Sequence, residues 1–339
     1  MKQRDPDLLL FHAPLLRQGM TTPKAMRDVL LALAPATLAS MWFFGLSAVL
    51  ILASCIGGAV AAEWLFANRQ ARGESLRDAT GVLTGLLLGL TLPPGLPLWM
   101  AFLGGFIGIA LGKVIWGGLG QNLFNPALLG RAFLLATFPI AMTTWVSAVP
   151  DGGFLQVYPG NLALPFMQVQ LDAMSSATPL GLMKFEQEVT PLTNLMFGKT
   201  TGSLGETSGL LLLLGGVFLW LRRDLDWRIP VSILLTVMVF SAILGLFDAD
   251  RFPSPLFSVF SGGLLLGAIY MATDPVTSPV TPKGAWIFGI GTGVLVMLIR
   301  VFGGLPEGVM YAILLMNAAT PLIDRYTQPR VFGRGGDSQ

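Results

Sequence analysis

Long apolar runs alternate along this 339-residue chain with short segments that carry most of its charged residues. A helix needs about 20 mainly apolar residues to cross the hydrocarbon core of a membrane, and ten of the runs approach or reach that length. We therefore predict an all-α integral membrane protein with about ten transmembrane helices. The predicted spans are 28–44, 46–67, 79–96, 98–116, 124–141, 207–221, 229–247, 255–273, 284–302 and 306–323.

Proline interrupts or ends two of these runs, at Pro93-Pro94 in the third and at Asp274-Pro275 in the eighth. Backbone groups freed in this way are tolerated at membrane depth only where protein or a cavity covers them. We expect broken helices at both places.

A repeated motif suggests that the spans form two related halves, 28–141 and 207–323. The third run contains Gly85-Leu-Leu-Leu-Gly89 and the eighth contains Gly263-Leu-Leu-Leu-Gly267, and Gly117-Gly118-Leu119 is echoed by Gly303-Gly304-Leu305. The third span would run outward and the eighth inward, so the pattern predicts two inverted five-helix repeats, as in some transporters. The alternative is chance, since strings of Gly and Leu are common in membrane helices.

Lys and Arg gather in alternate connections, as the positive-inside rule requires. We predict that the tails 1–27 and 324–339 are cytoplasmic and that the long connection 142–206 is extracytoplasmic. The predicted inner segments hold Lys2, Arg4, Arg17, Lys24, Arg27, Arg69, Arg72, Arg77, Arg222, Arg223, Arg228, Arg325, Arg330 and Arg334, whereas the outer side holds Lys184, Lys199 and Arg251, with Arg300 near a span end.

Composition narrows the possible chemistry. Hydrophobic residues make up 53% of the chain, charged residues 12%, and the mean hydropathy is +0.68, so lipid is the expected surrounding. The net charge of only +2 gives no reason to expect a nucleic-acid partner. With Cys55 and His12 as its only cysteine and histidine, the chain by itself lacks the usual ligands of an iron–sulfur cluster or a bis-histidine haem, and we predict no metal site.

The connection 142–206 is too long for an idle loop and contains a run of small residues that ends at a threonine. This run comprises Asp172, Ala173, Met174, Ser175, Ser176, Ala177 and Thr178, and Pro179 follows it. Small neighbours leave the Thr178 hydroxyl accessible. The residues alone favour an ordinary helix cap at this threonine over a cofactor site.

At this motif the chain resembles the D subunit of the Rnf electron-transport complex and the related B subunit of sodium-pumping NADH:quinone oxidoreductase. The resemblance extends over nearly the whole chain, including 28–36, 120–127 and 274–279. In that family an Asp-x-x-Ser/Thr-Gly-Ala-Thr motif receives FMN through a phosphoester to its last threonine, attached by a flavin transferase. The resemblance implies covalent FMN on Thr178, with Asp172, Ser175 and Ala177 matching the motif and Ser176 in the place of its usual glycine.

Asn122 and Asn125 precede the fifth span, with Pro126 at its expected first position and Arg131 further along. From the residues alone, Asn before Pro is a helix cap, and an arginine near a membrane interface extends toward the headgroups. The resemblance implies a second role for the two asparagines, as contacts of a non-covalent riboflavin. Glu63, Asp274 and Glu307 lie near predicted interfaces, where we expect them to be solvated, and Cys55 is expected to be a packing residue.

We interpret the chain as a subunit of a bacterial inner-membrane complex that moves electrons between ferredoxin and NAD while it drives sodium ions or protons across the membrane. The resemblance implies partners in the other subunits of that complex, the flavin transferase and membrane lipid. The chain has no nicotinamide-binding glycine fingerprint in a strand–turn–helix context, so catalysis by the isolated chain is not expected. Two alternatives stay open: a transporter or channel without a redox cofactor, and a structural anchor subunit.

Overall fold

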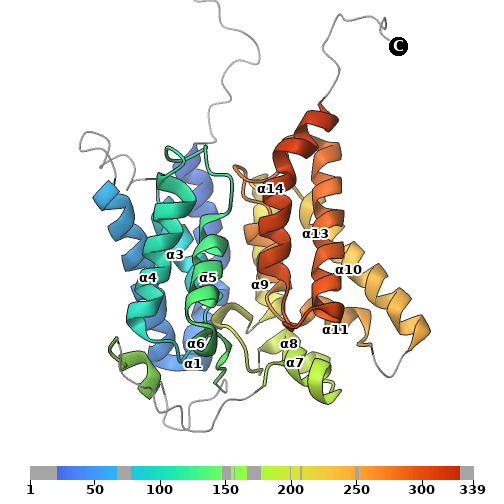
Figure 1. The fold of residues 1–339 in the computed structure, drawn as a ribbon, viewed down its shortest axis with the longest axis horizontal. Coiled ribbons are helices and arrows are strands. Elements are labelled where there is room, and N and C mark those ends of the chain that lie inside the picture. Colours follow the sequence, from blue (N-terminus) through green and yellow to red (C-terminus); the bar gives the residue numbers. More distant parts are fainter. Residues whose placement is uncertain are drawn as a thin grey trace, which may run out of the picture.

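The computed structural model describes residues 21–66, 78–146, 154–155, 157–165, 177–198, 200–206, 208–248 and 252–328. These residues form helices and connections and contain no β-strand. Two groups of helices stand side by side, one ending at α6 and the other beginning at α9 (Figure 1). The long helices are α1 (Thr22–Phe66), α3 (Thr80–Leu90), α4 (Leu98–Ile109) continued by η1 (Ala110–Val114), α5 (Pro126–Thr137), α9 (Gly209–Arg222), α10 (Arg228–Phe247), α13 (Pro282–Phe302) and α14 (Val309–Thr327).

Short elements fill the connection between the two groups and the region of the eighth predicted span. The connection elements α6, α7 and α8 lie at one end of the bundle, whereas α1 begins and α14 ends at the opposite end (Figure 1). The short elements are α6 (Pro139–Thr143), η2 (Pro159–Leu162), α7 (Pro179–Gly181), η3 (Leu182–Glu186), α8 (Leu192–Phe197), η4 (Leu204–Glu206), α11 (Pro255–Phe260), α12 (Leu264–Leu266) and η5 (Gly267–Met271).

Gly45 breaks α1 at the residue that separates the predicted spans 28–44 and 46–67. Its backbone has φ +62° and ψ −145°, a conformation that glycine adopts without strain. The Leu46 amide donates to the Phe154 carbonyl at 2.9 Å, and a Cβ atom at Gly45 would lie only 2.6 Å from that oxygen. The tight contact explains why glycine occupies this position.

Both predicted proline breaks lie outside helices. α3 ends at Leu90, before Pro93-Pro94, and η5 ends at Met271, before Asp274-Pro275. The eighth span has a further break that the sequence did not indicate, at Ser261-Gly262, where Gly262 has φ +67°. The region of the eighth predicted span is therefore more fragmented than α3, although both contain the Gly-Leu-Leu-Leu-Gly motif.

Small residues bring backbones together in both groups, as is common in membrane helix packing. A Cβ atom at Gly105 of α4 would lie 2.2 Å from the carbonyl oxygen of Cys55, and one at Gly85 of α3 would lie 2.9 Å from the same oxygen. Gly289 and Gly293 of α13 approach α10 in the same way. Cys55 is fully buried, so the packing role expected for it is confirmed.

Three described helices are long and apolar enough to cross a membrane: α1, α10 and α13. Shorter apolar helices are found at Thr80–Leu90, Leu98–Val114, Pro126–Thr137 and Gly209–Arg222. Leu246 and Phe247 at the end of α10 are more than four-fifths exposed, as residues facing lipid would be. The apolar helices confirm an all-helical membrane protein, while the ten-span inverted topology stays a prediction.

Candidate functional site

A cavity of about 370 Å³ lies beside Thr178, at the end of the bundle that holds the connection elements. We call it the outer cavity, because the sequence predicts that the connection 142–206 at this end is extracytoplasmic. It is lined from three parts of the chain: α5 and α6 with the residues that follow, the segment 177–186, and the connection between α13 and α14. Its aromatic lining residues are Trp145, Phe185 and Tyr311. Ligand pockets of about 300–1,000 Å³ are typical of proteins, so this volume suits a cofactor-sized molecule.

Thr178 caps α7 and at the same time lines the outer cavity. Its Oγ1 atom accepts a hydrogen bond from the Gly181 amide at 3.1 Å, and Pro179 occupies the first helical position. The cap expected from the residues alone is therefore present. A hydroxyl that accepts one bond keeps its own proton and a second lone pair, so the cap leaves the oxygen available for chemistry. Ala177 also lines the cavity, whereas Asp172, Ser175 and Ser176 lie outside the described residues.

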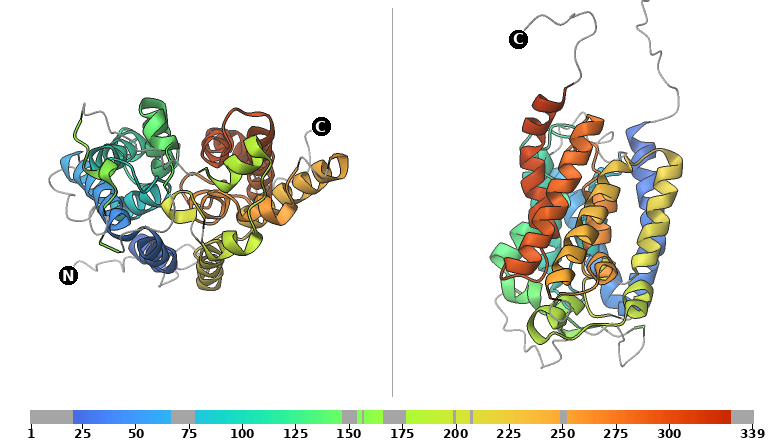
Figure 2. Two further views of the ribbon diagram at one scale, coloured as in Figure 1. Left: turned by 90° about the horizontal axis from the view of Figure 1, so that it is seen from below. Right: turned by 90° about the vertical axis from the view of Figure 1, so that its right-hand side faces the viewer.

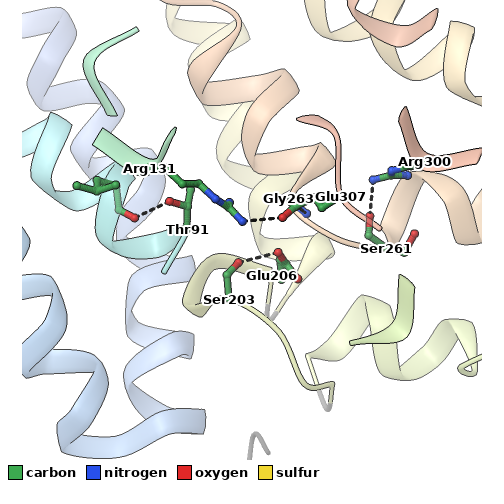
Figure 3. Close-up of polar contacts among 9 residues, drawn as sticks. Thr91, Arg131, Ser203, Glu206, Ser261, Gly263, Arg300 and Glu307 are labelled. Atoms are coloured by element: carbon green, nitrogen blue, oxygen red, sulfur yellow. Dashed lines mark hydrogen bonds and ion pairs between the residues drawn. The ribbon is translucent and has the colours of Figure 1, made fainter. Parts of the chain in front are cut away.

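Arg131 and Glu307 form an ion pair in the wall of the outer cavity and join the two halves of the molecule (Figure 3). The Arg131 Nη2 atom lies 2.6 Å from Glu307 Oε2, and Glu307 Oε1 accepts a bond from the Gly263 amide at 2.9 Å. The two side chains are only 10% and 19% exposed, so water screens their electrostatic attraction only weakly. The expectations that Arg131 extends toward the headgroups and that Glu307 is simply solvated are wrong, because each side chain finds its partner in the other half.

Glu206 lies near this pair and accepts a hydrogen bond from the Ser203 hydroxyl at 2.8 Å (Figure 3). Burial, followed by the nearby charge of Glu307, raises the pKa of Glu206 to about 7. The connection that carries Glu206 is held to the first half by the Leu204 amide, which donates to the Leu92 carbonyl at 3.1 Å.

Lys184 anchors the segment that follows Thr178 to the second half. Its Nζ atom donates to the carbonyls of Arg300 at 2.8 Å, Leu305 at 3.1 Å and Gly303. All three donors of the ammonium are thus used. Desolvation lowers the pKa of Lys184. η3 is therefore fixed against the connection between α13 and α14, which supplies another wall of the outer cavity.

A second cavity, of about 100 Å³, lies beside Asn122 and Asn125, and we call it the inner cavity. Asn125 caps α5 through Oδ1, which accepts from the Ala127 amide at 3.0 Å, and its Nδ2 donates to the Met271 carbonyl at 3.1 Å. The Asn122 Oδ1 atom is buried and has no hydrogen-bond partner in the part of the chain that the structure describes. The helix cap expected at Asn125 is present, and Asn122 alone keeps a free acceptor.

Lys113, in the wall of the inner cavity, belongs to a buried charged pair. Lys113 Nζ contacts Glu63 Oε1 and donates to Thr80 Oγ1 at 2.7 Å, and both charged side chains are at least nine-tenths buried. The expectation that Glu63 is solvated is therefore wrong. Asp274, which lines the same cavity, is half-buried and accepts hydrogen bonds from the Val276 amide at 3.2 Å and the Thr277 hydroxyl at 3.4 Å.

The two cavities differ in how well they suit a flavin. The outer cavity combines sufficient volume, aromatic walls and an accessible hydroxyl. The inner cavity offers the free Asn122 acceptor, but its volume lies below that of typical ligand pockets, so a flavin ring does not fit it in this conformation.

Comparison with known proteins decides the family. The model of the NQR2, RnfD, RnfE family matches residues 10–333. The chain belongs to this family.

Members of the family from several bacteria match this chain almost from end to end. The D subunit of the proton-translocating ferredoxin:NAD(+) oxidoreductase complex of Clostridium ljungdahlii is 41% identical over 335 residues, which cover 95% of both chains. The D subunit of the ion-translocating oxidoreductase complex of Stutzerimonas stutzeri is 43% identical and covers 92% of both. The D subunit of the Na(+)-translocating ferredoxin:NAD(+) oxidoreductase complex of Acetobacterium woodii is 38% identical and covers 96% of both. The family resemblance predicted from the sequence is confirmed.

The sequence did not predict which residues of the two halves contact each other. It identified Arg131 and Glu307 separately, but their pairing across 176 positions follows from tertiary packing. The one available signal was their opposite charge within or beside apolar runs, where an unpaired charge is costly.

Proposed function

We propose that this chain is the D subunit of an ion-translocating ferredoxin:NAD oxidoreductase complex and that it carries FMN esterified to Thr178. The subunit assignment is supported by family membership and by the names of relatives that match the chain over nearly its full length. The observation that carries the flavin proposal is the Thr178 hydroxyl at the wall of a cofactor-sized cavity.

In this proposal each wall of the outer cavity has a physical task. Thr178 supplies the oxygen of the phosphoester, while the cap to Gly181 fixes its direction. Trp145, Phe185 and Tyr311 offer faces and edges on which an aromatic ring packs. Arg131 is held in the cavity wall by Glu307, so the pair is neutral and contributes N–H donors instead of a net positive charge. FMN, when bound, supplies the ability to accept and donate electrons, which no side chain here provides.

We also propose the ten-span inverted topology in the bacterial inner membrane, with both termini cytoplasmic and 142–206 extracytoplasmic. The distribution of Lys and Arg along the sequence supports this orientation. The start of α1 and the end of α14 lie at the same end of the bundle, opposite α7 and α8, as this topology requires (Figure 1).

A non-covalent riboflavin at the inner cavity is a further part of the proposal. Its support is the unpartnered Oδ1 of Asn122, which suits the ring N–H of a flavin. Because the cavity measures about 100 Å³, binding there requires the walls to move apart. Asn125 would contribute by holding α5 to η5 and not by direct contact.

Electron entry and exit would depend on partners in this scheme. Among the described residues no group of three or more His, Cys, Asp or Glu is placed to hold a metal ion. We propose that other subunits of the complex deliver and remove electrons and that a flavin transferase attaches the FMN.

A transporter or channel without a redox cofactor is the second candidate. The break at Ser261-Gly262 and the buried Lys113–Glu63 pair favour it, because discontinuous helices and buried charges are common in transporters. Such a protein has no need for a modified threonine, so the flavin separates the two candidates.

Denaturing gel electrophoresis under ultraviolet light tests the proposal. The chain is expressed with its partner subunits and a competent flavin transferase, in wild-type form and as Thr178→Ala and Thr190→Ala. Thr190 lies in the same connection and is the matched control. Fluorescent bands are expected from the wild type and Thr190→Ala and none from Thr178→Ala. Fluorescence from Thr178→Ala, or none from the wild type, would overturn the flavin assignment.

A further inference from the structure

A third cavity, of about 440 Å³, lies next to the outer cavity and shares Phe185 and Pro306 with it. We call it the side cavity. Its walls come from η3, the last turns of α10 and α13, and the start of α11. The C-terminal end of α10 projects away from the rest of the bundle (Figures 1 and 2).

The charged residues that line the side cavity are all positive. Arg300 and Lys184 line it, and no Asp or Glu is among its lining residues. Arg300 is only 8% exposed and forms no direct ion pair within the described residues, although the carboxylates of Glu206 and Glu307 lie nearby, beside Gly263. Because no carboxylate lines the cavity itself, the two cations in its wall favour a bound anion there.

Arg300 has donors to spare. Its Nη2 donates to the Ser261 carbonyl at 3.0 Å (Figure 3), and its Nη1 donates to the Ser258 carbonyl at 2.6 Å. The two bonds hold the break between α11 and α12. Its Nε is buried and has no partner in the described structure. The Nε atom is too buried to face the cavity, but each Nη atom carries two N–H groups and uses one of them, so the second N–H of each is left for an oxyanion.

The other polar groups contribute differently. Lys184 adds charge but no donor, because its three N–H groups already bind carbonyls. Ser241 and Ser258 bond to each other at 2.9 Å. The side chain of Gln187, at the exposed edge, can donate to a ligand.

The remaining walls are apolar, which indicates a ligand with an apolar part. Leu244, Met297 and Val301 line the cavity, and beyond it Leu246 and Phe247 are exposed on the projecting end of α10. A hydrocarbon chain that leaves the cavity would lie along this surface. Within a membrane, the molecule that joins an oxyanion to hydrocarbon chains is a phospholipid.

We propose that the side cavity binds the phosphate group of an anionic phospholipid from the leaflet next to the 142–206 connection. An ammonium headgroup would meet Arg300 and Lys184 without a compensating carboxylate, so a zwitterionic lipid should bind less well. The site requires only that the chain spans the membrane and is independent of a flavin at Thr178.

The test uses the complex that contains this subunit, reconstituted into nanodiscs of equal parts phosphatidylglycerol and phosphatidylcholine. After a detergent wash, the lipids that remain are counted by mass spectrometry. The wild type should retain about one phosphatidylglycerol per chain, and Arg300→Gln should weaken this retention about tenfold, which corresponds to about 1.4 kcal/mol, because a charge-assisted hydrogen bond is lost. Arg325→Gln, at the opposite end of the bundle, should leave retention unchanged.

Because Arg300→Gln also removes the tether to Ser258 and Ser261, Leu244→Trp provides an independent variant that fills the cavity and keeps those bonds. It should also release the lipid. Equal retention of the two lipids by the wild type, or full retention by Leu244→Trp, would overturn the proposal. Displacement of the lipid by excess inorganic phosphate would reassign the site to a free oxyanion and overturn the lipid assignment.

Discussion

The outer cavity lies at the end of the bundle that holds α7, and the inner cavity lies beside the start of α1, at the opposite end. Their polar residues use their hydrogen-bonding groups differently. At the outer cavity, Thr178 caps a helix and still presents its oxygen to a space of about 370 Å³. At the inner cavity, the Asn125 oxygen caps α5 and its side-chain nitrogen donates to the Met271 carbonyl of η5, and the cavity measures about 100 Å³. A polar residue in a family motif can therefore either bind a ligand or stabilise the fold. The hydrogen-bonding groups that it leaves unused in the fold distinguish the two roles.

The largest effect on stability is expected at the Arg131–Glu307 ion pair in the wall of the outer cavity. Arg131→Met leaves the Glu307 carboxylate without its cation and should lower the free energy of unfolding by about 3–5 kcal/mol. Arg131→Met combined with Glu307→Gln should recover most of that loss, because neither member of the pair then remains as a buried charge without the other. Arg228→Met is the control, since the Arg228–Asp226 pair is more than one-third exposed and should contribute less than about 1 kcal/mol. Denaturant titration of the purified protein measures all three, and equal losses at Arg131 and Arg228 would contradict the account.

The two asparagines of the inner cavity should respond in opposite ways. Asn125→Ala removes a helix cap and the bond to Met271, so it should cost about 1–3 kcal/mol of unfolding free energy. Asn122→Ala removes an acceptor that has no partner, so stability should stay the same or rise slightly. Thermal unfolding followed by circular dichroism separates the two variants. A greater loss of stability for Asn122→Ala would show that its role in the fold has been underestimated.

Much of the helical order was predictable from the sequence because it depends on local features. The break at Gly45, the end of α3 before Pro93-Pro94 and the cap at Asn125 all follow from residue types at short spacing. The break at Ser261-Gly262 was not predictable, because Arg300 stabilises it from 39 and 42 positions away. The partners of Glu63 and Glu307 were missed for the same reason, since each lies in another helix or in the other half. Thr178 was found through a family motif, and the cavity beside it emerged only from the packing of three separate segments.

A smaller effect is expected from Thr178→Ser. Serine keeps the hydroxyl that would form the ester, but it lacks the methyl group that restricts rotation about χ1. Flavin loading should therefore be partial, between the wild type and Thr178→Ala. In-gel fluorescence normalised to protein measures it, and a complete loss would show that orientation of the hydroxyl matters more than its presence.

The smallest effect is expected from Ser176→Gly, which restores the usual glycine of the family motif. Loading should equal or exceed that of the wild type, because glycine leaves more room beside the attachment site. The same normalised fluorescence provides the measurement. A clear decrease would show that Ser176 contributes a contact that the family motif does not anticipate.

Mass spectrometry of the proteolytic peptide that contains Thr178 decides whether this threonine carries FMN. The protein is isolated after expression with a competent flavin transferase and its partner subunits. We predict an increase in mass that corresponds to FMN, located on Thr178 by fragmentation. An unmodified peptide from that preparation would contradict the account and remove Thr178 as the cofactor site.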